Sequence, residues 1–148
     1  MVSLHCTAAD PGVSGADVFT FAPQAASTQA HGVAELENGV TRFERALAPA
    51  MPAPGAGELL AGWRERRKVS ASSDVASRVR AALAGEGSGA SANALGAPLK
   101  VLGGAACPAI LVEAGYLSSQ RDAARLGDDA ALARTAAAIA QALTDNAG

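Results

Sequence analysis

Residues 107–119 read Cys107-Pro108-Ala109-Ile110-Leu111-Val112-Glu113-Ala114-Gly115-Tyr116-Leu117-Ser118-Ser119. Residues 109–112 form a short apolar run rich in branched side chains, and Pro108 and Gly115 bound it. Such a run is typical of a strand that is buried on both faces of a parallel or mixed sheet. The pattern therefore predicts a central strand over residues 108–113.

A carboxylate, Glu113, follows this apolar run at the carboxyl end of the predicted strand. Open α/β sheets place ligands and chemistry at that end. A buried carboxylate there needs a cation, a metal ion or a hydrogen-bond donor beside it, because desolvation otherwise costs too much. Ser118 and Ser119 are candidate N-caps for a short helix predicted over residues 119–126.

The segment from Pro108 to Ser119 resembles the C-terminal motif of zinc-dependent N-acetylmuramoyl-L-alanine amidases of the amidase-3 type, which hydrolyse the bacterial cell wall. Two more segments match in family order. Residues 2–6 are similar to the Ser-Ile-His strand of the family, and residues 15–19 to its Gly-Val-Glu-Val-Phe strand. The sequence departs at Ser119, where the family usually has Asn.

The resemblance implies an α/β fold, with a layered mixed or parallel sheet that includes residues 2–6, 15–21 and 108–113. It implies that His5 is a zinc ligand and that Glu113 is the catalytic acid and base. Both side chains are then expected at the same edge of the sheet. From the residues alone, a lone histidine on an apolar strand, such as His5, is usually a core residue with a hydrogen-bond partner, and the alternative for Glu113 is a carboxylate held by a helix N-terminus or a basic side chain.

The family takes two further zinc ligands, a His and a Glu, from strands that precede the segment matching His5. This sequence begins at that segment, so we expect it to be the C-terminal part of a longer amidase that lacks the N-terminal strands. The resemblance implies a peptidoglycan substrate, cleavage of the amide between the muramyl lactyl group and L-alanine, and a periplasmic or extracellular location. The alternative is a metal-free remnant that binds cell-wall peptide or a partner.

With one His and one carboxylate matched, we expect the chain to bind zinc weakly or not at all, because affinity follows ligand number and geometry. His31, the other histidine, is expected to be exposed. Glu35 and Glu37 are candidate replacement ligands, since related amidases can carry an occluding helix at this place.

A chain of 148 residues is long enough for one domain with a sizeable core. We expect a single amidase-like domain over residues 1–148, with a variable helical insertion at about 22–72. The net charge of −2 gives no electrostatic argument for nucleic acid or an anionic membrane. No run of 18 apolar residues and no signal-peptide pattern occur in the sequence. Cys6 and Cys107 are interpreted as buried small residues, with a disulfide as the alternative.

Helical periodicity predicts helices over residues 32–48, 56–68, 74–84 and 129–144. Ser73 and Asp74 are expected to cap the third, and Gly85 to end it. The last helix is expected to bury Leu132, Ala136, Ile139, Ala140 and Leu143. Residues 98–102 are expected to be extended.

Overall fold

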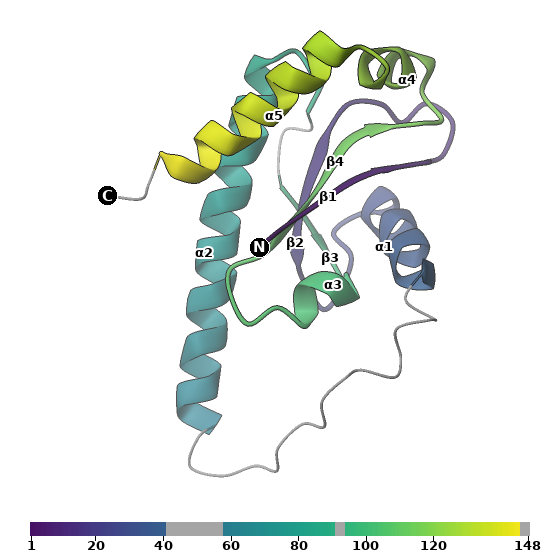
Figure 1. The fold of residues 1–148 in the computed structure, drawn as a ribbon. Helices are drawn as coiled ribbons and strands as arrows, with labels where there is room; N and C mark the ends of the chain where they lie inside the picture. Colours follow the sequence, from purple (N-terminus) through teal and green to yellow (C-terminus); the bar gives the residue numbers. More distant parts are fainter. Residues whose placement is uncertain (41–57, 91–93, 146–148) are drawn as a thin grey trace.

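The computed structural model describes residues 1–40, 58–90 and 94–145, and this part of the chain contains a four-stranded mixed sheet in the order β1-β4-β2-β3 (Figure 1). Strand β1 (Val2–Thr7) pairs in parallel with β4 (Ile110–Tyr116). Strand β2 (Asp17–Phe21) pairs antiparallel with β4 and parallel with β3 (Leu95–Ala97). The predicted α/β sheet is confirmed, with the three predicted strands as neighbours.

Helices cover both faces of this sheet (Figure 1). One face packs on α1 (Thr28–Val40) and α3 (Lys100–Gly103), with Phe19, Leu111 and Tyr116 at the centre of the core. The other packs on α2 (Glu58–Gly85) and α5 (Asp129–Thr144), around Val18, Ile110 and Val112. Consecutive residues of β4 thus enter opposite cores, which explains its continuous apolar run.

Strand β4 extends beyond the predicted end at Glu113 and passes through Gly115. This glycine does not end the strand. A Cβ at this position would lie 2.8 Å from Nη2 of Arg125 and 3.2 Å from Cβ of Asp122. Glycine is therefore needed because α4 (Gln120–Leu126) packs directly over the strand. Ser119 caps α4, as predicted, by accepting a hydrogen bond from the Asp122 amide at 3.2 Å.

The prediction of separate helices over 56–68 and 74–84 is wrong, because α2 is one continuous helix that ends at Gly85 as expected. Ser73 does not cap a helix; its hydroxyl donates to the Val69 carbonyl one turn back at 3.1 Å. Ser72 bonds to Lys68 in the same way at 2.8 Å. Serines tolerate a helix interior when they bond to the preceding turn, so they are ambiguous signals for a helix start.

The extended segment predicted over 98–102 is also wrong. The strand lies earlier, as β3, and residues 100–103 form the short helix α3. Pro98 separates the two; a proline lacks the N–H needed to continue a ladder of hydrogen bonds. In α1, the helix begins before the predicted residue 32, and the predicted residues 41–48 lie outside the described part of the chain.

The predicted boundaries of α5 are confirmed, but its predicted buried stripe is largely wrong. Its buried residues are Ala131, Thr135, Ile139 and Ala142. Only Ile139 was predicted; Leu132, Ala136, Ala140 and Leu143 are exposed. The helix packs on α2, and three of its four buried side chains, those of Ala131, Thr135 and Ala142, are short.

Both cysteines are free thiols and both are exposed, so their interpretation as buried residues is wrong. Cys107 lies 3.7 Å from the amino group of Met1, at the start of β1, whereas Cys6 is near the end of that strand. None of the described helices is both long enough and apolar enough to cross a membrane.

Candidate metal and acid–base site

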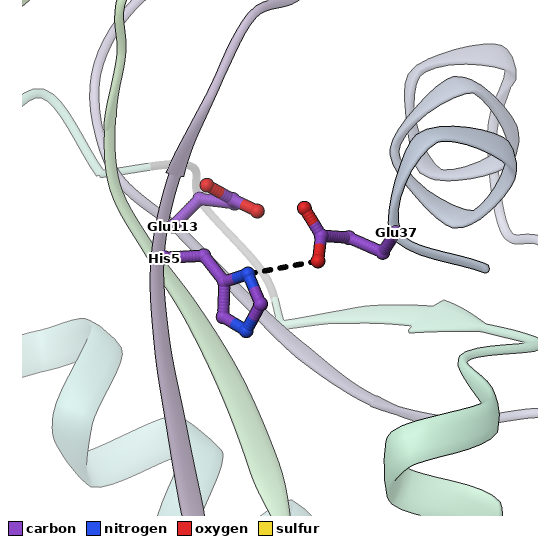
Figure 2. Close-up of side chains that lie close together, drawn as sticks. All are labelled: His5, Glu37 and Glu113. Carbon is purple, nitrogen blue, oxygen red and sulfur yellow. Dashed lines mark ion pairs between the residues drawn. The ribbon is translucent and has the colours of Figure 1, made fainter. Parts of the chain in front are cut away.

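His5 and Glu113 lie side by side, as the sequence predicts. They are Cα partners in the parallel pairing of β1 with β4, so their side chains leave the same face of the sheet. Figure 2 shows Glu37, from α1, reaching toward both of them. One ligand atom from each of the three residues lies within 4.8 Å of the other two.

The His5 ring has a polar partner at each nitrogen. Its Nδ1 lies 2.8 Å from Oε2 of Glu37 (Figure 2). Its Nε2 lies 2.7 Å from the Ser3 hydroxyl oxygen. The side chains of His5 and Glu37 are 33% and 14% exposed, so this pair is partly shielded from water. The ring is therefore held in one orientation, with Nδ1 toward the carboxylates.

Glu113 is fully buried and only half satisfied. Its Oε2 accepts a hydrogen bond from the Thr7 amide at 3.0 Å. Its Oε1 is the one buried side-chain polar atom in the described part of the chain that has no hydrogen-bond partner. An unpaired buried acceptor costs about 1–3 kcal/mol. The site therefore has an open position for a cation or a proton at this oxygen.

The pKa of Glu113 is raised from 4.5 to about 7, first by burial and second by the nearby Glu37 carboxylate. The hydrogen bond from Thr7 opposes the shift, and Asp17 adds a smaller upward contribution to the pKa. A carboxyl group with a pKa near neutrality can both accept and release a proton under working conditions. Such a group in a polar cluster is a candidate for acid–base chemistry.

A second buried carboxylate, Asp17, lies next to Glu113 on β2 and is its Cα partner there. Its Oδ2 accepts hydrogen bonds from the Tyr116 hydroxyl at 2.6 Å and from the Gln29 amide at 2.5 Å. Burial, together with this hydrogen bond, raises the pKa of Tyr116, so the phenol stays protonated. Because Gln29 belongs to α1, the network fixes the helix that carries Glu37.

Of the three candidates in the segment 31–37, only Glu37 reaches the site. His31 is exposed as predicted, and it pairs with Glu35 at 3.7 Å on the outer face of α1. Val33 is buried, and Glu37 follows it by one helical turn on the same face. An acidic residue at helical spacing from a buried valine was the signal that separates Glu37 from Glu35.

Sequence reasoning missed Ser3 and the Asp17 network. Ser3 precedes His5 by two residues on a strand, which is enough to predict a shared face. Asp17 had no such signal, because its partners come from distant segments, Gln29 and Tyr116.

A hollow of about 440 Å³ lies beside the site, between the loop after β1 and the inner face of α1. Ala8 lines this hollow and directly follows Thr7, the residue whose amide donates a hydrogen bond to Glu113. Its walls are mostly apolar, and Asp10 and Gln29 are among its polar members. This volume lies within the range of small-ligand pockets.

The donor set fits a zinc ion. Zinc is bound in proteins by imidazole nitrogen and carboxylate oxygen. The cluster supplies one donor of each kind, His5 and Glu37, within reach of Glu113, whose unpaired Oε1 lacks the partner that a buried carboxylate requires.

The family of the chain follows from its sequence. The family model described as N-acetylmuramoyl-L-alanine amidase matches residues 1–145. This chain belongs to that amidase family. The resemblance seen in three short segments thus extends across residues 1–145 of this chain. Members of this family are generally metal-dependent, and His5, Glu37 and Glu113 form a group that could hold a metal ion.

Solved amidase structures have the same fold. The amidase-family chain is similar to the CwlD amidase of Clostridioides difficile, solved in complex with the GerS lipoprotein, at a TM-score of 0.60 and 14% identity, covering 97% of this chain and 52% of that one. It is similar to the N-acetylmuramyl-L-alanine amidase of Mycobacterium smegmatis at a TM-score of 0.58 and 18% identity, and the match covers 97% of this chain and 51% of that one.

The corresponding enzyme of Mycobacterium abscessus gives a TM-score of 0.56 at 19% identity, covering 97% of this chain and 52% of that chain. The amidase-family chain therefore spans about half the length of these three structures. No curated protein matches its sequence significantly.

Proposed function

We propose that this chain is the catalytic part, or a portion of it, of a peptidoglycan amidase. The enzyme hydrolyses the amide between the muramyl lactyl group and L-alanine. The observation that carries the proposal is Glu113: a buried carboxyl group with a pKa near 7 and one unpaired oxygen, beside His5 and Glu37. The family membership of the chain supplies the substrate class. The protein would then act in the cell envelope, where peptidoglycan lies.

In this proposal His5 and Glu37 hold a zinc ion. When bound, zinc supplies Lewis acidity, which lowers the pKa of a water molecule and polarises a carbonyl group. Catalytic zinc sites generally use three protein ligands. The described residues offer two besides the catalytic Glu113, so the zinc affinity of this chain is expected to be weak, in line with the prediction from the sequence.

Glu113 does the proton chemistry. Its Oε2 is held by the Thr7 amide, which leaves Oε1 as the atom that takes a proton from the attacking water. The same oxygen then returns the proton to the leaving amine. Its raised pKa, about 7, suits both steps, since it is neither too weak a base nor too weak an acid.

The hollow beside α1 gives room for the peptide part of the substrate. At about 440 Å³ it accommodates small peptide side chains against Val33 and Leu36.

The proposed organisation is a single amidase-like domain with a variable helical insertion at about 22–72. The predicted end of this insertion, residue 72, falls within the continuous helix α2.

The test is the release of L-alanine-bearing peptides from purified peptidoglycan by the full-length natural protein, with zinc and after chelation. We expect zinc-dependent release that Glu113→Gln abolishes while zinc stays bound. The 148-residue chain alone is expected to release none, because its described residues offer too few metal ligands. Release that survives both chelation and Glu113→Gln would refute the proposed mechanism.

One observation favours a second candidate, a metal-free domain that binds cell-wall peptide. The 2.8 Å contact between His5 and Glu37 already satisfies the donor atoms that a metal would use. Stoichiometric zinc in the purified full-length protein separates the two candidates. Peptide binding without zinc, and without hydrolysis, would favour the second.

A further inference from the structure

We propose that Ser3 is the positioning residue for His5, and that its hydroxyl directs Nδ1 of the imidazole, rather than Nε2, toward the metal. The inference rests on the metal-holding part of the proposed function. It concerns a residue that touches neither Glu37 nor Glu113 in the contacts of the site; Ser3 acts only through the His5 ring.

The geometry comes from β1. Ser3 and His5 are two residues apart on this strand, so they project from the same face. Their side chains meet at 2.7 Å between Oγ and Nε2. Within the described sheet β1 is an edge strand that pairs only with β4, and the His5 side chain is 33% exposed. A ring at such a position needs a partner to hold it in one orientation.

A hydroxyl suits both states of the ring, because it can donate and accept a hydrogen bond. Without metal, the 2.8 Å contact to Glu37 places the ring proton on Nδ1, and Ser3 donates to Nε2. With metal, Nδ1 must present its lone pair, so the proton moves to Nε2, which donates to Ser3. Metal-bound histidines commonly donate their second ring N–H to such a partner, which fixes the tautomer.

Nuclear magnetic resonance of ring nitrogens tests this placement directly. The metal-free chain, labelled with ¹⁵N histidine, is studied at about pH 8, above the ordinary His pKa of about 6.5. We expect His5 to show a protonated Nδ1 and an unprotonated Nε2. In Ser3→Ala the Nε2 atom of His5 loses its hydrogen-bond donor, so the ¹⁵N resonance of this nitrogen should shift, whereas the resonances of exposed His31, which is far from the substitution in the sequence, serve as the internal reference. Unchanged His5 shifts in Ser3→Ala would overturn the proposal.

Metal binding gives the second readout. Zinc or cobalt affinity, measured by competition with a chelator, should fall about 10–100-fold in Ser3→Ala. Ser3→Thr keeps a hydroxyl and should restore most of it. Ser70→Ala, which removes an exposed serine hydroxyl on α2, is the matched control and should bind as the parent does. Equal affinity in Ser3→Ala, or coordination through Nε2 in the loaded chain, would overturn the inference.

The two arms separate this inference from the proposed function. If the full-length natural protein binds no metal, the metal-holding part of the proposed function fails. The ring-nitrogen experiment still decides whether Ser3 orients His5, because it is done without metal.

Discussion

Asp17 and Glu113 face each other on adjacent strands, and both are buried, yet they are treated differently by their surroundings. Asp17 receives hydrogen bonds from a phenol and an amide. Glu113 receives one, on Oε2, and its other oxygen has none among the described residues. The comparison teaches that burial alone does not identify a reactive carboxylate; the missing partner does.

The consequence is a division of roles. The Asp17 network joins β2, β4 and α1, so it holds the fold around the site. The incomplete solvation of Glu113 instead raises its pKa to about 7. Asp17 thus stabilises the fold. Glu113 is buried at an energetic cost, and this burial leaves it able to accept and release a proton.

The largest expected effect is the loss of hydrolytic activity when Glu113 is replaced. In the full-length natural protein, Glu113→Gln should lower peptide release from peptidoglycan about 10²–10⁴-fold, the usual cost of losing a general base. The amide keeps the shape but cannot accept the proton. Circular dichroism should show an unchanged fold. Activity within a few fold of the parent would remove Glu113 from the mechanism.

For stability we expect the opposite: replacing Asp17 should destabilise the fold more than replacing Glu113. Asp17→Ala leaves the hydroxyl of Tyr116 and the amide of Gln29 without their charged acceptor. Hydrogen bonds to charged groups contribute about 1.5–3 kcal/mol each, so the loss of two should lower the free energy of unfolding by about 3–6 kcal/mol. Urea unfolding measures this, with Tyr116→Phe as the smaller, single-bond variant.

In the same assay Glu113→Gln should not destabilise the chain by more than about 1 kcal/mol, because the amide removes a buried charge. If the two variants destabilise equally, the division between a stabilising and an available carboxylate is wrong.

The pH dependence of stability sharpens the same comparison. Glu113 has a pKa of about 7 when folded, against 4.5 as its ordinary value, so the folded state binds more protons between these limits. Its contribution is therefore favourable below about pH 4.5 and is lost as the pH rises to about 7. The change in unfolding free energy is at most about 3 kcal/mol.

Urea unfolding of the metal-free chain across this pH range measures the slope. Glu113→Gln should remove it, whereas Asp17→Asn should leave most of it. A slope that persists in Glu113→Gln would assign the titration to another group.

The smallest effect concerns the third member of the cluster. Glu37→Gln should weaken zinc binding at least about tenfold, or about 1.4 kcal/mol, because it removes the carboxylate beside Nδ1 of His5. Glu35→Gln is the matched control on the same helix, since that side chain is 73% exposed and faces away. Competition with a chelator measures both. Equal affinities would exclude Glu37 as a ligand.

Much of the site was readable from local patterns. The apolar run before Glu113 predicted the central strand, and β4 contains it. His5 and Glu113 were placed at one edge of the sheet, and they are Cα partners. These predictions succeed because a strand has a period of two residues, so its sequence states which side chains share a face.

Local patterns failed where packing decided the outcome. Gly115 indicated a strand end, but it lies within β4 because α4 leaves no space for a side chain. Ser73 indicated a helix start, but its hydroxyl bonds within the continuous α2. In each case the residue is compatible with two local structures, and the residues packed around it determine which one forms.

The sequence by itself determined the strands β1, β2 and β4, the positions of His5 and Glu113 along two of them, and the amidase family. The tertiary structure alone decided that Glu37 joins them, that Asp17 is satisfied and that Glu113 is not. The reason is physical. Periodicity is a property of neighbours along the chain, whereas the pKa and hydrogen bonding of a buried carboxylate depend on groups that distant segments bring within a few ångströms.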